Sequence, residues 1–312
     1  MEAGKRNLYD IFNGGKVLEI PYFQRGYVWS EPQWQRLLED MENISQHKKP
    51  YFMGSVILKQ QETPSNAKVG DVRTVIDGQQ RLTTLHIFFK VLGLRTHDDY
   101  LTNELFRLRG KEKELALKHS YSYQAIFEHV MDMQTEEDLS KNKDNISKAY
   151  TYFKENIHPE KLDYDAILNN ILLVGIDVSK EEDEQQIFDT INSLGVQLTT
   201  AELLKNFFFK RDYEAYVKYW QNVFEKDTET KMFWDSSITT GRFKRTIIDL
   251  FFYAYLQIKI QETYNGKKVS TEDKIEFSKV DCLFESYKSF IKTYNIDIKT
   301  LLDDIKIYAE SP

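Results

Sequence analysis

A strand runs directly into a helix at VIDGQQRLTTL, residues 75–85. Residues 72–76 form a short β-branched run, and apolar residues recur at helical spacing downstream of the stretch. Residues 77–81 therefore form a strand-to-helix corner. Because the first amides of a helix lack intrahelical acceptors and carry the positive end of its dipole, the corner predicts an anion site.

Each side chain of the corner has a role in such a site. Gly78 permits close approach of a ligand, and Arg81 offers a planar fork of donors that matches phosphate oxygens. Gln79 and Gln80 can donate or accept hydrogen bonds, and Asp77 is placed to hold a metal ion, orient a water or bind a sugar hydroxyl. A purely structural explanation of these residues remains open. Asp-Gly is a common turn, Asp is a common helix cap, and first-turn glutamines usually face water.

A second polar pair lies in an aromatic-rich loop, PYFQRGYVW, residues 21–29. Gln24 and Arg25 need partners wherever they lie, because a buried polar group without a hydrogen bond is costly. One interpretation is that both add donors to the anion site, while Tyr27 or another aromatic residue of the loop stacks on a base or closes the pocket. The other is a structural loop anchored by Trp29, with Arg25 paired to a surface acid.

Length and composition are those of an ordinary globular protein. The 312 residues, 41% hydrophobic and 14% aromatic, can bury a full core and form one large or two ordinary domains. A net charge of -7 excludes a polycation that coats nucleic acid, so any DNA contact must use a local basic surface. The only cysteine, Cys282, excludes an intramolecular disulfide, and neither a signal peptide nor a membrane span is evident. We therefore expect a cytoplasmic protein without a membrane partner.

Hydrophobic periodicity predicts a compact α/β unit followed by a mainly helical region. A glycine inside the second expected strand, Gly54, marks a bulge or a close backbone approach. The expected strands are 17–20, 51–58, 72–76 and a returning strand at 171–178. The expected helices are one that starts at a capping box at 30–33, the one after the corner, 111–119, 121–133, 146–157, 186–194, one capped by Thr199 or Thr200, 216–224, 243–260, 274–294 and 298–308.

Four segments stand in order along the chain: IPYFQRGYVW at 20–29, FMGS at 52–55, IDGQQRLTTL at 76–85 and FDTINSLGVQL at 188–198. Together they resemble the N-terminal domain of GmrSD-type restriction endonucleases, a family of the ParB and sulfiredoxin-like superfamily. The resemblance implies an α+β fold, in which a small ParB/sulfiredoxin-like mixed α/β core precedes a mainly helical region. It also implies a nucleotide-binding domain at 1–210 and a helical domain at 211–312, with the C-terminal His-Asn-His nuclease domain of restriction-type members absent.

The resemblance also assigns site residues. It implies a domain that binds and often hydrolyses nucleotides in bacterial defence against phage, typically where modified DNA is sensed. Gln24 and Arg25 are expected in the same pocket as the corner. Asn192 matches a family position that faces this pocket, although a capping role explains it equally well, and Lys205 or Asn206 approaches from the next helix. The family's nucleotide site carries over to Asp77, Gly78, Gln79, Gln80 and Arg81.

Three functions follow from these patterns. The leading hypothesis is a Mg²⁺-dependent NTPase, for GTP, ATP or another nucleotide, that regulates a modification-dependent, type IV-like restriction system. Here Asp77 and Arg81 are catalytic, Asp77 holds the metal ion, and Arg25 helps to hold phosphates. The alternative is a noncatalytic ParB-like module that binds DNA or a partner and uses nucleotide as a switch. Direct DNA cleavage by this chain alone is not expected, because a two-metal site needs several carboxylates.

The expected partners follow from the leading hypothesis. They are an NTP, DNA from modified phage genomes, and a nuclease domain or subunit, and we expect the chain to form a homo-oligomer. The six histidines show no metal-ligand spacing, and no nucleophile constellation can be assembled from the serines and the cysteine. Any chemistry of the chain is therefore expected at the corner.

Overall fold

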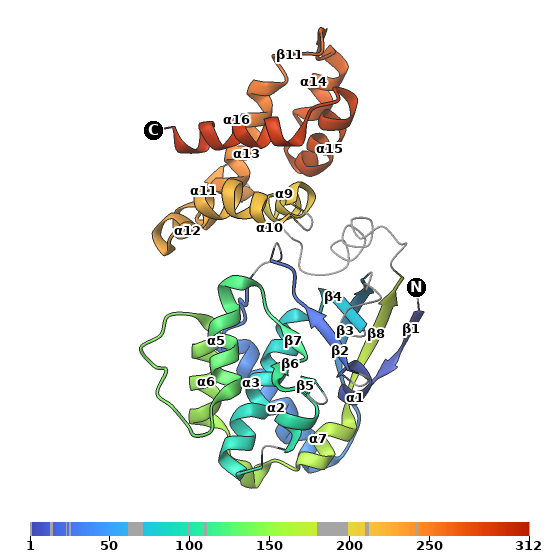
Figure 1. The fold of residues 1–312 in the computed structure, drawn as a ribbon, viewed down its shortest axis with the longest axis vertical. Coiled ribbons are helices and arrows are strands. Elements are labelled where there is room, and N and C mark those ends of the chain that lie inside the picture. Colours follow the sequence, from blue (N-terminus) through green and yellow to red (C-terminus); the bar gives the residue numbers. More distant parts are fainter. Residues whose placement is uncertain are drawn as a thin grey trace. The chain divides into compact units, whose positions relative to one another are not determined.

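The chain divides into two compact units, Met1–Phe188 and Asp189–Pro312. The computed structural model describes residues 2–12, 15–22, 24, 26–61, 71–98, 100–108, 111–179, 199–209, 212–240 and 243–311. An α+β fold is confirmed: the first unit contains a mixed sheet with helices, and the second is mainly helical (Figure 1).

The first unit is built on a six-stranded sheet with the strand order β1-β8-β3-β4-β2-β7 (Figure 1). Within it, β4 is parallel to β2 and antiparallel to β3, whereas β3 and β8 are parallel. All four strands expected from the sequence are confirmed. The strands of the sheet are β1 (Glu2–Arg6), β2 (Lys16–Glu19), β3 (Tyr51–Gln60), β4 (Asp71–Asp77), β7 (Leu117–Lys118) and β8 (Ile171–Val178).

The helix that follows the corner, α3 (Gln79–Thr96), is the central element of the core. It is buried on all sides from Leu82 to Leu94, as expected for a helix that is apolar around its whole circumference. Residues of α2, α5 and α6 share this hydrophobic core with α3. The remaining elements of the unit are α1 (Leu8–Phe12), α2 (Glu31–His47), α4 (Tyr100–Glu104), the hairpin β5 (Arg107–Leu108) and β6 (Lys111–Leu115), α5 (Tyr121–Asp132), α6 (Asn145–Asn156), η1 (Pro159–Lys161) and α7 (Tyr164–Asn170).

Two local predictions are confirmed and one is wrong. The capping box at Ser30 and Gln33 is present at the start of α2, and the register of β3 against β8 shifts at Gly54. The helix expected at 111–119 is instead β6 and β7. β6 pairs with the neighbouring β5 in a hairpin and β7 pairs with the distant β2, and this strand pairing outweighs the helical propensity of the segment.

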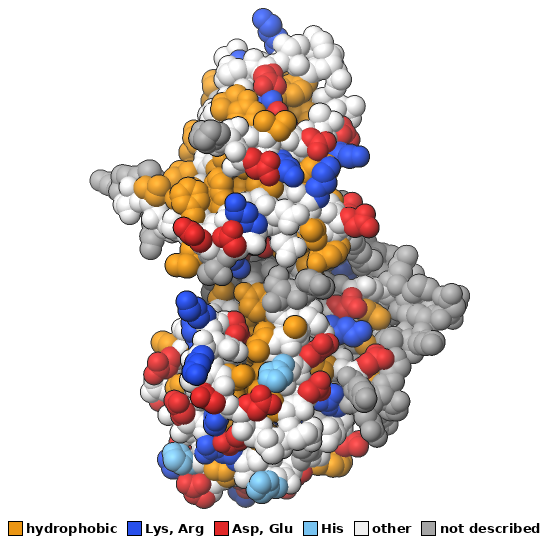
Figure 2. All heavy atoms as spheres, turned by 60° about the vertical axis from the view of Figure 1, so that its left-hand side comes forward, with side chains coloured by type: hydrophobic (Ala, Val, Ile, Leu, Met, Phe, Trp, Pro, Cys, Tyr) orange, Lys and Arg blue, Asp and Glu red, His pale blue; other side chains and the backbone are white. Residues whose placement is uncertain are grey.

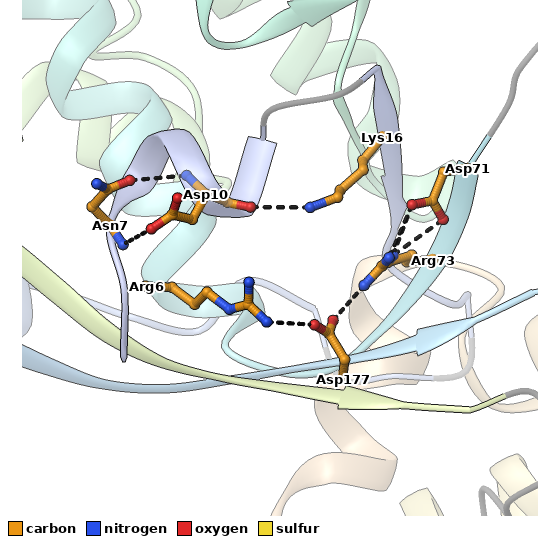
Figure 3. A network of polar contacts seen from close by, with 7 residues as sticks. All are labelled: Arg6, Asn7, Asp10, Lys16, Asp71, Arg73 and Asp177. Atoms are coloured by element: carbon orange, nitrogen blue, oxygen red, sulfur yellow. Dashed lines mark hydrogen bonds and ion pairs between the residues drawn. The ribbon is translucent and has the colours of Figure 1, made fainter. Parts of the chain in front are cut away.

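A network of ion pairs joins strands at the amino end of β4, the end remote from the corner (Figure 3). Arg73 of β4 holds Asp71 through Nε and Nη2 at 3.0–3.1 Å and also pairs with Asp177 of β8. Arg6 of β1 donates from Nη2 to the other oxygen of Asp177 at 2.9 Å. Because β3 lies between β4 and β8, the Arg73 contact spans three strands and fixes this end of the sheet.

A neutral histidine lies inside the first unit. His86 of α3 is 0% exposed, its ring stacks on Phe106 with centroids 3.9 Å apart, and Nδ1 bonds the carbonyl of Leu82 at 2.7 Å. Its Nε2 is buried without a hydrogen-bond partner among the described residues. Burial lowers the pKa of His86 to about 3, and burial together with His86 lowers the pKa of His119 to about 3.

We expect the protein to lose stability on mild acidification. Because the folded-state pKa of His86 lies below its unfolded value of about 6.5, the unfolded chain binds the proton first as the pH falls. The contribution of His86 is fully present above about pH 6.5 and is lost as the pH falls towards 3, by about 1.4 kcal/mol per pH unit. Urea unfolding at about pH 7 and about pH 5 should differ by about 2 kcal/mol from this group.

The His86→Phe variant, which keeps an aromatic ring beside Phe106, should weaken this pH dependence, whereas replacement of the exposed His158 should not. An unchanged pH dependence in His86→Phe would contradict the assignment.

The second unit is mainly helical, but it is not helical throughout as the sequence predicted from Tyr213 onward. The helix expected at 243–260 begins as strand β10 (Phe243–Thr246), and Thr246 then caps helix α13 (Ile247–Lys259) by accepting from the amide of Asp249. The helix expected at 274–294 is two helices, and the one expected at 186–194 lies outside the described residues. No helix within the described ranges is long and apolar enough to cross a membrane.

The elements of the second unit are α9 (Thr200–Phe209), α10 (Tyr213–Tyr216), the π-helical turn η2 (Val217–Gln221), α11 (Asn222–Phe224), α12 (Thr228–Asp235), β9 (Ser237–Thr240), β10 (Phe243–Thr246), α13 (Ile247–Lys259), β11 (Thr263–Tyr264), β12 (Lys267–Lys268), α14 (Thr271–Phe277), η3 (Val280–Cys282), α15 (Leu283–Thr293) and α16 (Ile298–Glu310).

Candidate functional site

The corner forms where β4 ends at Asp77 and α3 begins. Gly78 is the N-cap residue of α3 and has a φ of +99°, a conformation that side chains disfavour. A Cβ at Gly78 would lie 2.8 Å from Cγ2 of Val56 and 3.2 Å from the carbonyl oxygen of Ser55, both in β3. The glycine is therefore required by the close approach of β3. Because it has no side chain to act as a cap, it leaves the first amides of α3 without a capping oxygen from this position.

Asp77 and Arg81 face each other across the first turn of α3. Nη2 of Arg81 donates to Oδ2 of Asp77 at 2.8 Å and to the carbonyl oxygen of Ser55 at 2.6 Å. The hydroxyl of Ser55 donates to the same Oδ2 at 3.0 Å. The side chains of Asp77 and Arg81 are 35% and 22% exposed, so the pair lies partly exposed at the surface of the first unit.

The guanidinium of Arg81 is anchored through one nitrogen, and its other N–H groups form no hydrogen bond with the described residues. Nη2 makes both bonds, and Nε is buried without a hydrogen-bond partner among the described residues. A Cβ at Gly54, which has a φ of +115°, would lie 3.5 Å from Cζ of Arg81, so the bulge of β3 makes the space in which the guanidinium lies. The sequence did not assign Ser55 or Gly54 to the site, although both stand in the FMGS segment of the family resemblance.

The first glutamine-arginine segment reaches the same end of β4. Gln24 is 8% exposed, and its Nε2 donates to the carbonyl oxygens of Val75 at 2.6 Å and Ile76 at 3.1 Å. Its Oε1 is buried and has no partner in the described part of the chain. Gln24 therefore lies beside the corner although it is far from it in sequence. Arg25 and Asn192, the other predicted site residues, lie outside the described residues.

The side-chain amide of Gln80 holds the aromatic loop. Oε1 accepts from the amides of Val28 at 2.8 Å and Trp29 at 3.2 Å, and Nε2 donates to the carbonyl oxygen of Gly26 at 2.9 Å. These bonds engage both polar atoms of the Gln80 amide, so in this structure it fixes the loop against α3. Gln79, the first residue of α3, is half-buried.

Tyr27 lies in the hydrophobic core and is 3% exposed. Its hydroxyl lies 2.7 Å from Oγ1 of Thr84 and accepts from Nε1 of Trp34 at 2.8 Å. Burial raises the pKa of Tyr27, so the phenol stays neutral. The geometry therefore gives Tyr27 a supporting place between α2 and α3.

Lys205 and Asn206, the other candidates, are buried residues of α9. The ammonium of Lys205 pairs with Oε1 of Glu225 at 3.1 Å within the second unit.

The residues of the corner fit Mg²⁺ and a nucleotide in two respects. Oδ1 of Asp77 has no hydrogen-bond partner among the described residues and can bind a cation, and Mg²⁺ commonly takes one or two carboxylates together with phosphate oxygens and water. In the described part of the chain no three His, Cys, Asp or Glu residues are grouped as a metal site. The partnerless Nε of Arg81 and Oε1 of Gln24 each cost about 1–3 kcal/mol, which a ligand or a water could recover.

The mixed sheet and its strand-to-helix corner define an α+β domain with an arginine and a carboxylate beside a helix N-terminus. Residues 8–209 match the family model described as the GmrSD restriction endonuclease, N-terminal domain. The chain belongs to this family, as the four sequence segments predicted, and is thereby a domain of a DNA restriction system. A search of curated proteins finds no match.

Proposed function

We propose that the corner binds a nucleoside triphosphate with Mg²⁺ and hydrolyses it, and that this activity regulates DNA restriction. The proposal rests on one observation: among the described residues Arg81 is anchored only to Asp77 and Ser55, through Nη2, at the start of an 18-residue helix whose N-cap residue has no side-chain cap bond. Family membership supports the connection with restriction.

Each residue of the corner has a defined task in this proposal. The first-turn amides of α3 and the remaining donors of Arg81 bind phosphate oxygens and stabilise the charge that develops on the transferring group. Oδ1 of Asp77 binds the metal ion or orients the attacking water, while Ser55 holds Oδ2. Gln24, Gln80 and Tyr27 support these groups from behind, and we retain Arg25 and Asn192 as proposed contacts. A bound Mg²⁺-nucleotide supplies the phosphoryl group and most of the metal ligands.

We also propose three macromolecular partners: modified phage DNA, a nuclease domain or subunit, and a second copy of the chain. DNA follows from the restriction family. Protein partners are supported by hydrophobic side chains gathered on one face of the second unit, in the upper part of Figure 2. Over the whole second unit, without regard to face, the exposed hydrophobic residues include Met232 at 68%, Phe233 at 55%, Ile275 at 65% and Ile307 at 64%. Apolar side chains gathered on one face, as in Figure 2, are typical of interaction sites.

The Asp77→Asn variant tests the chemistry. It keeps the size of the side chain and an oxygen for Arg81, but removes the charge that would bind Mg²⁺ or activate water. We expect nucleotide binding within a few-fold of wild type and hydrolysis slower by about 100-fold or more. Binding is measured by calorimetry and turnover by phosphate release, with GTP and ATP each in the presence of Mg²⁺. A wild-type chain that neither binds nor hydrolyses any NTP would refute the proposal.

A noncatalytic switch is the second candidate. It is favoured by the engagement of Asp77, because Oδ2 already accepts from both Arg81 and Ser55 and a ligand that competes for Arg81 would release it. This alternative predicts that the wild-type protein binds NTP without hydrolysing it. Asp77→Asn should then change the affinity for NTP, with no hydrolysis rate to alter. Metal-dependent cleavage of DNA by the isolated chain would contradict both candidates.

A further inference from the structure

A buried chain of hydrogen bonds runs from α2 through the aromatic loop to the first turn of α3. Nε1 of Trp34 lies 2.8 Å from the hydroxyl of Tyr27, which lies 2.7 Å from Oγ1 of Thr84. Oγ1 of Thr84 in turn donates to the carbonyl oxygen of Gln80 at 2.6 Å. The four residues are between 0% and 7% exposed, so water does not compete for these bonds.

The protons of this chain can be arranged in only one direction. A carbonyl oxygen only accepts, so the single proton of Thr84 goes to Gln80. The proton of Tyr27 must then go to Thr84, and the oxygen of Tyr27 accepts from the indole of Trp34, which only donates. Each bond therefore requires the next, and chains with one direction polarise and strengthen their members.

The chain ends on the residue that joins the two segments of the candidate site. The carbonyl of Gln80 receives the last bond, and the side-chain amide of the same residue holds Gly26, Val28 and Trp29. The loop is held from a second side by Asn145 of α6, whose Nδ2 donates to the carbonyl oxygen of Tyr27 at 3.2 Å. The position of Gln80 therefore determines both the first turn of α3 and the loop beside it.

We propose that Trp34, Tyr27 and Thr84 are positioning residues, whose one-way hydrogen-bond chain fixes Gln80 and thereby the geometry of the corner. None of the three is required to touch a ligand. Their effect on nucleotide affinity rests on the proposed function, whereas their effect on the loop and on the first turn of α3 does not.

The Tyr27→Phe variant tests the proposal, because it removes the hydroxyl and keeps the buried ring. We expect amide hydrogen exchange to accelerate by about 10-fold at residues 26–29 and 79–84 of the nucleotide-free protein, since the net loss of such a bond corresponds to a factor of this size. Where the wild-type chain binds an NTP, its affinity should fall by about 10-fold in the variant.

Tyr150→Phe is the matched control. Tyr150 is also a fully buried tyrosine of the first unit, and its hydroxyl accepts from the amide of Glu137 at 3.0 Å. Loss of the Tyr150 hydroxyl should lower the melting temperature about as much as Tyr27→Phe does. It should leave the amide exchange at 26–29 and 79–84 and the nucleotide affinity unchanged. Equal effects of the two variants on these readouts would overturn a specific positioning role.

A double variant separates positioning from stability. In Trp34→Phe/Tyr27→Phe the orphaned indole N–H is gone, so the fall in melting temperature should be smaller than the sum of the two single effects. The exchange at 79–84 and the affinity should remain as altered as in Tyr27→Phe, because Thr84, which holds the carbonyl of Gln80, still lacks the bond from Tyr27. Recovery of all three readouts together would show a purely structural role.

A second substitution tests the same hydrogen-bond chain if Tyr27→Phe does not fold. Thr84→Val removes the next hydroxyl of the chain with little change in side-chain volume. It should accelerate amide exchange at residues 26–29 and 79–84 in the same way. Unchanged exchange there in Tyr27→Phe, or in Thr84→Val where the first variant does not fold, overturns the proposal. A wild-type chain that binds no NTP would refute the proposed function instead, and the exchange measurement would still decide the positioning role.

Discussion

Replacing Arg81 with alanine is expected to lower kcat/KM for nucleotide hydrolysis by about 100- to 1,000-fold while the protein stays folded. Among the described residues the guanidinium is held beside Asp77 by a single nitrogen, and in the proposed function its other donors would meet phosphate oxygens. Its removal would then take away a charge-assisted contact that strengthens as charge moves onto the transferring group. Steady-state phosphate release, followed over a range of NTP concentrations, measures the effect.

Arg81→Ala should lower activity without unfolding the protein. The pair of Asp77 and Arg81 is partly exposed, and such ion pairs contribute little to stability. The melting temperature of Arg81→Ala should therefore stay close to that of the wild type, and its circular dichroism spectrum should be unchanged.

Arg107→Ala provides the matched control for Arg81→Ala. Nη2 of Arg107 likewise divides its bonds between a carboxylate, that of Asp132 at 2.7 Å, and a carbonyl, that of Met131 at 3.0 Å, in the same unit. Its removal should leave kcat/KM unchanged. Turnover at the wild-type rate in Arg81→Ala, or an equal loss in both variants, would rule out the assigned role of Arg81.

Replacing Glu225 with glutamine is expected to destabilise the second unit by about 3–5 kcal/mol. Oε1 of Glu225 accepts from the ammonium of Lys205 at 3.1 Å and from Nε1 of Trp220 at 3.0 Å, and Oε2 accepts from the hydroxyl of Tyr216 at 2.7 Å. The side chains of Lys205 and Glu225 are 8% and 18% exposed. Without the carboxylate, the ammonium remains buried and uncompensated, which is the costly outcome for a buried pair.

The same carboxylate predicts a loss of stability in acid. Burial alone would raise the pKa of Glu225, but Lys205, Lys231 and the hydroxyl of Tyr216 together lower it to about 2. Its contribution is therefore present above the unfolded value of about 4.5 and is lost as the pH falls through the range from 4.5 to 2. This window begins at a lower pH than the one expected for His86 and overlaps it below about pH 4.5, so the His86 effect can be separated from that of Glu225 between about pH 6.5 and 4.5.

Urea unfolding followed by tryptophan fluorescence measures the effect of Glu225→Gln, since Trp220 lies against the pair. In Lys205→Met/Glu225→Gln the buried charge is gone and the amide oxygen still accepts from Trp220, so most of the lost stability should return. Glu276→Gln is the exposed control, because the pair of Glu276 and Lys279 is 59% and 53% exposed and should matter little. Wild-type stability in Glu225→Gln would contradict this account of the pair.

The polar groups of the site separate into those that local sequence could identify and those that it could not. Asp77 and Arg81 were found because a β-branched run, an Asp-Gly turn and a helical pattern follow one another within a few residues. Ser55 and Gly54 could not be assigned in this way, since they reach the corner only through the pairing of β3 with β4. The local pattern marked Gly54 only as a bulge or close backbone approach, and the family segment FMGS was the signal that connected Gly54 and Ser55 with the other site segments.

The fold shows the same division. The sequence predicted five elements close to their observed bounds: α2, β3, β4, α3 and β8. Their apolar periodicity and their capping residues lie within short stretches of sequence. β1, with the sequence EAGKR, carries no apolar pattern and exists because it pairs with β8. The prediction of a helix at 111–119 was wrong because the local sequence pattern favours a helix. In the fold, β7 is instead a strand that pairs with β2 at the edge of the sheet.

The sequence by itself determined the α+β class, the family and the corner at Asp77–Arg81, because these depend on residues that are neighbours along the chain. Only the tertiary structure decided which polar atoms of the corner already have hydrogen-bond partners. Gln80 and Tyr27 are engaged by the loop and the core, whereas Oδ1 of Asp77 and Nε of Arg81 have no partner among the described residues. The physical reason is that a hydrogen bond depends on distance and direction in space, and strands and loops remote in sequence supply those partners.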